Sequence, residues 1–192
     1  MRSNDGVFKS EQKNSLLSES RTGWVTRNAS SVNTSEGVEV QSQWSPLEKK
    51  YNLGLNYTFT DTFDANTCSE DHKNAWSDNE CRHTGNAVAT AKVRVPRHAL
   101  SARAGYQFNS NFKTVLRGSY TGETRDFGNS NDSWTDQILT DYFVFDIGGN
   151  YKLSDYYNIT FGLENIFDEK YEQAHEYSAL GRTFNFGLKK VY

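Results

Sequence analysis

The side chains with the most nucleophilic or basic character in a regular segment are those of His98 and Ser101, three positions apart. In an extended strand, residues three apart point to opposite faces, so the two cannot form a nucleophile and base pair. The sequence also contains no nucleophile elbow and no glycine-rich loop of the kind that cradles phosphate. We therefore expect no enzyme activity.

A second group of reactive residues lies between positions 61 and 90, in a polar stretch rich in acidic residues and asparagine. Its two cysteines, Cys68 and Cys81, are too few for a disulfide framework and lack the partners of a zinc site, so we predict a single disulfide that closes this loop. The stretch also holds candidate metal ligands, namely His72, His83, Asp71, Asp78 and Glu80. Because no ligand spacing recurs among them, a solvated acidic loop is the favoured interpretation, and we predict no metal and no other cofactor.

The rest of the chain is organised by strict alternation of apolar and polar residues. This period of two is the signature of a β-strand with one apolar face. The apolar positions, from the first row to the last, are Val38, Val40 and Trp44; Tyr51, Leu53, Leu55, Tyr57 and Phe59; Leu100, Ala102, Ala104, Tyr106 and Phe108; Phe112, Leu116 and Tyr120; Phe143, Phe145, Ile147, Tyr151 and Leu153; Tyr157, Ile159, Phe161 and Leu163; and Phe184, Phe186, Leu188 and Tyr192.

Charged residues occupy the alternate positions of the same strands, which indicates that the opposite face is wet. The charged side chains predicted on that face are Arg103, Arg117, Glu123, Asp146, Lys152 and Glu164. An apolar face that runs to the last residue is unusual for a soluble sheet, and it suits a strand that faces lipid. The favoured interpretation of each charged residue is that it lines a solvated wall.

The connections between these strands alternate in length. They span residues 45–50, 61–90, 109–111, 126–140, 154–156 and 168–180. Short turns at one end and long loops at the other are typical of outer-membrane barrels. The pattern predicts an all-β fold, an antiparallel transmembrane β-barrel portion of about 7–8 strands in an up-and-down meander, with no helix longer than a turn or two.

Composition agrees with this class. The chain has 192 residues, a mean hydropathy of -0.79 and 14% aromatic residues. A low hydropathy is compatible with a barrel, because only alternate residues of each strand meet lipid. The formal charge of -3 and the dispersed basic residues argue against nucleic-acid binding. The N-terminus has no apolar segment of signal-peptide type, so we expect the chain to start within a longer protein.

The last 36 residues resemble the C-terminus of TonB-dependent outer-membrane receptors, which combine an Asn-Leu-Phe-Asp-x-x-Tyr stretch, a loop, a Gly-Arg pair and a final strand ending on an aromatic residue. The matching positions are Asn165, Ile166, Phe167, Asp168, Tyr171, Gly181, Arg182 and Tyr192. Two further stretches resemble the same family, Gly37-Val38-Glu39 and Arg94-Val95-Pro96-Arg97-His98. The similarity covers residues 23–192 and is greatest to the cobalamin-receptor and siderophore-receptor branches.

The resemblance implies a polar lead over residues 1–22, either poorly ordered or a strand remnant, followed by a C-terminal barrel portion over residues 23–192. It implies a receptor in the outer membrane of a Gram-negative bacterium, for uptake of a metal chelate, cobalamin or another scarce nutrient. Its implied partners are outer-membrane lipid, the barrel-assembly machinery, a small-molecule ligand, and the TonB system acting through a plug domain that this chain does not contain. The final strand, with Phe184, Phe186, Leu188 and Tyr192, would be the assembly signal.

Two other functions are compatible with a two-faced sheet. One is a complete eight-stranded barrel that acts as an adhesin or structural anchor. The other is a soluble ligand-binding barrel of lipocalin type, which the outward aromatic and inward charged residues disfavour because a soluble barrel reverses that arrangement. The in-frame codons upstream of Met1 would distinguish a receptor fragment from a small complete barrel.

Overall fold

The computed structural model describes residues 2–12, 16–19, 25–28, 33–46, 50–63, 92–130 and 133–190 of the chain. These residues form fourteen β-strands and no helix. No helix long and apolar enough to cross a membrane occurs in the part described.

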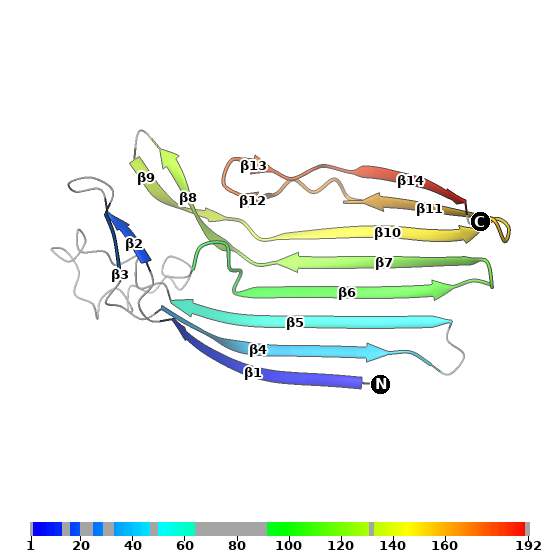
Figure 1. Cartoon of the computed structure of the whole chain (residues 1–192), viewed down its shortest axis with the longest axis horizontal. Helices are drawn as coiled ribbons and strands as arrows, with labels where there is room; N and C mark the ends of the chain where they lie inside the picture. The colour runs from blue at the N-terminus through cyan, green and yellow to red at the C-terminus, as the bar shows by residue number, and fades with distance from the viewer. Residues whose placement is uncertain are drawn as a thin grey trace.

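Eight strands form one antiparallel sheet, a single layer in the order β1-β4-β5-β6-β7-β10-β11-β14 (Figure 1). Each strand pairs with its neighbours in an unbroken register, which confirms the predicted antiparallel meander. The strands are β1 (Arg2–Gln12), β4 (Asn33–Trp44), β5 (Tyr51–Phe63), β6 (His98–Gln107), β7 (Phe112–Thr121), β10 (Tyr142–Lys152), β11 (Tyr157–Glu164) and β14 (Thr183–Lys190).

The register places the apolar rows of all the strands on one face. Val38 lies opposite Phe59, Tyr57 opposite Leu100, and Leu116 opposite Ile147, so each pair shares a face. Arg117 lies opposite Asp146 on the other face. The predicted placement of Phe145 and Phe186 on the face that Arg117 and Asp146 do not share is therefore confirmed.

This sheet encloses almost no hydrophobic core. Among the side chains described, Leu139 is the one hydrophobic residue that is buried, whereas Phe184, Phe186 and Leu188 are 68%, 66% and 62% exposed. A soluble domain buries such rows, because each exposed large side chain forgoes about 1.5–3 kcal/mol of transfer free energy. The apolar face is therefore built to contact a surrounding that is itself apolar.

Aromatic side chains gather at both ends of the sheet. At the end of the sheet with the short turns, four rings contact one another in succession. The centroids are 4.9 Å apart for Tyr51 and Tyr106, 4.6 Å for Tyr106 and Phe108, and 4.9 Å for Phe108 and Phe112. At the other end, Tyr120 contacts Phe143 with ring centroids 4.5 Å apart. Two such belts, one at each end of an apolar band, are the arrangement found at the two interfaces of a membrane.

The connections follow the predicted alternation of length. The short turns β4–β5, β6–β7 and β10–β11 lie at one end of the sheet (Figure 1). The longer connections β1–β4, β5–β6, β7–β10 and β11–β14, called the long excursions below, lie at the other end (Figure 1). Three short hairpins belong to the long excursions: β2 (Leu16–Glu19) with β3 (Val25–Asn28), β8 (Thr124–Ser130) with β9 (Ser133–Leu139), and β12 (Glu172–Ala174) with β13 (Tyr177–Ser178).

Three details differ from the sequence-based expectation. The polar lead contains β1, an 11-residue strand that alternation does not reveal because Val7 is its one residue with a large apolar side chain on the apolar face. Residues 25–28, within the expected barrel portion, form β3, which pairs with β2 and not with the main sheet. The stretch 126–140, expected to be an irregular loop, is mostly the β8–β9 hairpin.

Candidate functional site

Residues 165–182, which follow β11, fold into a compact loop around Asn165, called the Asn165 loop below. This side chain is buried (4% exposed), and its backbone adopts the left-handed conformation with φ of 50°. Its Nδ2 donates to the carbonyl oxygens of Glu169 (3.0 Å) and Leu180 (3.3 Å), and its Oδ1 accepts from the N–H of Glu169 (2.8 Å). Asparagine is among the few residues that tolerate this backbone conformation while bonding locally. One side chain thus ties both ends of the loop before β14 together.

Asp168 also joins two distant parts of this loop. Its Oδ1 accepts from the backbone N–H of Arg182 (2.8 Å), and its Oδ2 lies 3.1 Å from Nζ of Lys170. The Arg182 N–H first, and Lys170 second, hold the pKa of Asp168 below its usual range. A Cβ on Gly181 would lie 2.5 Å from the Asp168 Oδ1, so a larger residue there would displace this carboxylate. Asp168 and the small Gly181 together therefore let the chain close this loop.

Two further contacts hold the Asn165 loop against the sheet. The N–H of Asn165 donates to Oδ1 of Asp146 on β10 (2.9 Å), and the rings of Tyr171 and Tyr142 stack with centroids 4.1 Å apart. Burial is the main cause that raises the pKa of Tyr171 above its usual value. Because Tyr142 shares the face of Asp146, the ring of Tyr171 covers the polar face at the long-excursion end.

Asp126 joins three of the long excursions. It is 1% exposed, and it accepts hydrogen bonds from Nε of Arg94 (3.1 Å) and from the backbone N–H of His175 (2.7 Å). The N–H of Arg94 in turn donates to the carbonyl of Arg125 (2.8 Å). Arg94 belongs to the segment before β6, Asp126 to β8, and His175 to the β12–β13 hairpin. Charge-assisted bonds to a buried carboxylate are among the strongest in proteins, so these segments form one unit.

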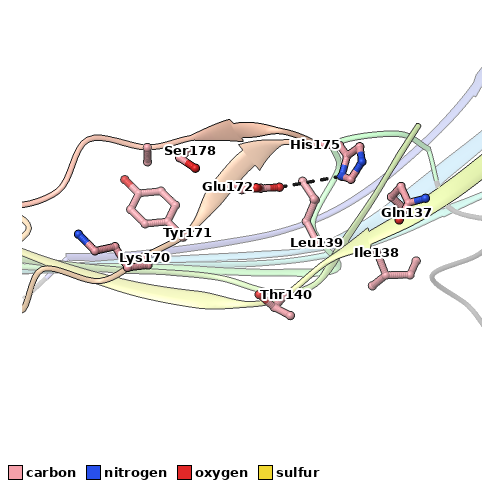
Figure 2. Close-up of a pocket in the computed structure, with 10 residues that line it drawn as sticks. Gln137, Ile138, Leu139, Thr140, Lys170, Tyr171, Glu172, His175 and Ser178 are labelled. Atoms are coloured by element: carbon pink, nitrogen blue, oxygen red, sulfur yellow. Dashed lines mark ion pairs between the residues drawn. The ribbon is translucent and has the colours of Figure 1, made fainter. Parts of the chain in front are cut away.

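A cavity of about 390 Å³ lies between β9 and the β12–β13 hairpin. Figure 2 shows residues 137–140 on one wall and residues of the 170–178 segment on the other. Polar and aromatic groups line it, among them Gln137, Tyr171, Glu172 and His175, and Nδ1 of His175 lies 4.0 Å from Oε2 of Glu172. Such a lining can hold a small polar molecule by hydrogen bonds and ring contacts. Within the described residues no group of His, Cys, Asp and Glu side chains is arranged to hold a metal ion.

The residues singled out from the sequence fall into three groups. Cys68, Cys81, His72, His83 and their acidic neighbours, together with Tyr192, lie outside the described residues, so the disulfide and the terminal aromatic stay predictions. His98 and Ser101 do lie on opposite faces: His98 pairs with Phe59 on the apolar face, and Ser101 pairs with Asn56 on the polar face.

The third group consists of the charged residues expected on the wet face. The strand register places five of the six on the polar face: Arg103, Arg117, Asp146, Lys152 and Glu164. Glu123 follows β7 and belongs to no strand.

Sequence reasoning missed Asp126 and, apart from Tyr171, the residues that line the cavity. One signal was present: residues 128–133 are a cluster of Gly, Asn, Ser and Asp of the kind that favours a turn. No sequence signal, however, shows that Asp126 would meet Arg94 and His175, because those partners are 32 and 49 positions away.

Comparison with known proteins gives one family and a set of similar folds. Residues 5–166 match the family described as TonB dependent receptor-like, beta-barrel. The pyoverdine outer-membrane receptor FpvA of Pseudomonas aeruginosa, bound to pyoverdine, superposes with a TM-score of 0.72 at 13% identity, over 99% of this chain and 27% of that one. The FrpB iron transporter of Neisseria meningitidis gives 0.69 at 15% identity, over 97% and 28%.

The ferric-catecholate import receptor Fiu of E. coli is a third similar structure, with a TM-score of 0.68 at 15% identity over 98% of this chain and 25% of that one. The chain thus spans about a quarter of the length of these structures. A search of curated proteins found no match.

Proposed function

Since this chain belongs to the family of TonB-dependent receptor barrels, we propose that it forms part of the barrel wall of an outer-membrane transporter for a scarce nutrient, a metal chelate or cobalamin. Proteins of this family are transporters and not enzymes. The observation that carries the proposal is the eight-stranded sheet whose exposed apolar residues share one face, with Arg103, Arg117, Asp146, Lys152 and Glu164 on the other.

The two faces and the two aromatic belts support a position in the membrane. The apolar face would contact outer-membrane lipid and the polar face would line the interior of the barrel, in a Gram-negative cell. The last strand, with Phe184, Phe186, Leu188 and Tyr192, would be recognised by the barrel-assembly machinery. Energy would come from the TonB system through a plug domain, which is a proposal about the whole receptor.

The substrate class is supported by fold similarity. FpvA is described with pyoverdine, FrpB as an iron transporter and Fiu as a ferric-catecholate receptor. The cavity beside Tyr171 and His175 lies at the long-excursion end, where a ligand arriving from outside the cell would first meet the barrel. We infer that an iron chelate is the first substrate to test, with cobalamin second.

Transport assays on the complete gene product test this function. The protein would be expressed in a host without competing receptors, with and without the inner-membrane TonB complex, and offered labelled ferric pyoverdine, a ferric catecholate or cobalamin. We expect accumulation of at least one of them, and only when the TonB complex is present. Equal accumulation without that complex, or a protein that does not fractionate with the outer membrane, would contradict the proposal.

The small-barrel alternative is favoured by one observation, the count of eight strands in the main sheet. Against it, β1 and β14 end the strand order, and no pairing joins them in the described part of the chain. Unpaired edges in hydrocarbon cost several kcal/mol for each backbone group. Residues 1–192 expressed alone behind an export signal should therefore give no heat-modifiable monomer. Such a monomer would mean that the edges close on each other and would favour an anchor or adhesin.

A further inference from the structure

Two arginines face each other across neighbouring strands in the middle of the polar face. Arg103 on β6 and Arg117 on β7 are direct partners in the register, and both side chains are exposed. Directly opposed residues in an antiparallel pair have Cβ atoms about 4.5–5.5 Å apart, so two positive charges are held close together. Like charges at such positions destabilise a sheet unless an anion joins them.

The nearby carboxylates form no ion pair with either arginine in the described part of the chain. Asp146 is the register partner of Arg117 on its other side, but its Oδ1 accepts from the backbone N–H of Asn165 (2.9 Å). Glu164 on the same face accepts from Nδ2 of Asn185 (2.9 Å).

The surroundings leave both guanidinium groups within reach. The register partner of Arg103 on β5 is Gly54, and a Cβ built there has no atom within 4 Å. Ser101, Gly105 and Ser119 occupy the adjacent positions on the same face. With these small neighbours the two planar donor groups are exposed, and each can bind a carboxylate through two parallel N–H bonds.

We propose that Arg103 and Arg117 form an anion site that binds a carboxylate of the domain filling the barrel, the plug domain that this family implies. The inference rests on the proposed function, because that function makes the polar face an inner wall. A resident carboxylate is favoured over a passing substrate for two reasons. The arginines stand halfway along rigid strands and not in a loop, and Asp146, the one carboxylate opposite Arg117, does not balance both positive charges, so a permanent counter-ion stabilises the pair where a transient one does not.

The test uses the complete gene product in outer membranes. Arg117→Lys keeps the positive charge and supplies a primary amine, which a water-soluble carbodiimide joins to a contacting carboxyl group as an amide with loss of water. We expect mass spectrometry to find this position linked to an Asp or Glu of the plug domain. Lys113 is the matched control, since it lies on the same strand and face but opposite Gln107 and Asn150, and it should give no such link.

The second variant, Arg103→Lys, covers the case in which Arg117→Lys fails to assemble. A variant that assembles, as judged by heat-modifiable mobility, and yields links only within residues 1–192 or none at all overturns the proposal. A plug link from Lys113 as strong as that from position 117 also overturns it, because the contact is then not specific to the pair. If the proposed function itself is wrong, the unsubstituted protein shows no heat-modifiable mobility. If only the anion site is wrong, the protein assembles but the cross-link to the plug domain is absent, so the two failures are distinguishable.

Discussion

At the residue scale, Asn165 explains why the Asn-Ile-Phe-Asp-x-x-Tyr stretch has its composition. The first residue adopts a left-handed backbone and donates to the carbonyls of Glu169 and Leu180, and the fourth accepts from the N–H of Arg182. The resemblance predicted that these residues matter. It did not predict their roles, because the partners Leu180 and Arg182 become neighbours only when the loop folds back.

Replacement of Asn165 by Ala should destabilise the assembled protein. The change removes three hydrogen bonds of a buried side chain and places a non-permissive residue at positive φ. Together we expect a loss of about 2–4 kcal/mol. Urea titration in lipid vesicles measures it, with Asn158→Ala on β11 as the control, expected within about 0.5 kcal/mol. Equal stability of the two variants would show that the Asn165 loop contributes nothing to the free energy of unfolding.

Asp168 should make the stability depend on pH. Because its pKa is lowered in the folded state, it contributes stability above the unfolded pKa of about 3.9, and this contribution is lost as the pH falls through the folded value. Asp168→Asn has no charge to lose. The difference in unfolding temperature between the unsubstituted protein and Asp168→Asn should therefore be largest near pH 6 and should shrink below about pH 4. A difference that stays constant with pH would contradict this role.

At the element scale, alternation predicted seven of the eight strands of the main sheet, because each carries an apolar row on one side. The eighth strand, β1, has a polar sequence and is held by backbone pairing with β4, so periodicity gave no signal. The β8–β9 hairpin escaped for a related reason: it stands at the long-excursion end, beyond the aromatic belt that ends at Phe143, and needs no apolar row. The elements that sequence reasoning missed are therefore those without an apolar row.

Two adjacent glycines of β10 should respond differently to a methyl group. A Cβ on Gly149 would lie 2.3 Å from the ring of Phe161, whereas a Cβ on Gly148 would have the carbonyl oxygen of Phe161 as its neighbour at 3.5 Å. Gly149→Ala should therefore displace this ring and lower stability by about 1–3 kcal/mol. Gly148→Ala should stay within about 0.5 kcal/mol.

The temperature at which heat-modifiable mobility is lost compares the two variants. Adding Phe161→Leu to Gly149→Ala should recover part of the loss, because the smaller side chain leaves room for the new methyl group. Equal effects of the two glycine substitutions would mean that the ring does not rest on Gly149.

At the scale of the whole molecule, the described sheet is a single layer with two different faces. Its apolar residues have no partner layer in the part of the chain that the structure describes, and Leu139 is the one buried hydrophobic residue there. This architecture is stable only if lipid covers one face and a wet interior covers the other. The apolar exposure, the aromatic belts and the charged interior therefore all depend on one claim, the orientation of the wall.

Accessibility of a spin label along β10 tests that claim most directly. In the complete gene product with Cys68 and Cys81 replaced by Ser, a nitroxide is attached to a single cysteine at Val144, Phe145, Asp146 or Ile147 in turn, in lipid vesicles. We predict that collisions with oxygen, which concentrates in lipid, are frequent at 145 and 147, and that collisions with a water-soluble nickel chelate are frequent at 144 and 146. Accessibility without alternation, or with the opposite phase, would contradict the account of this protein as a membrane barrel wall.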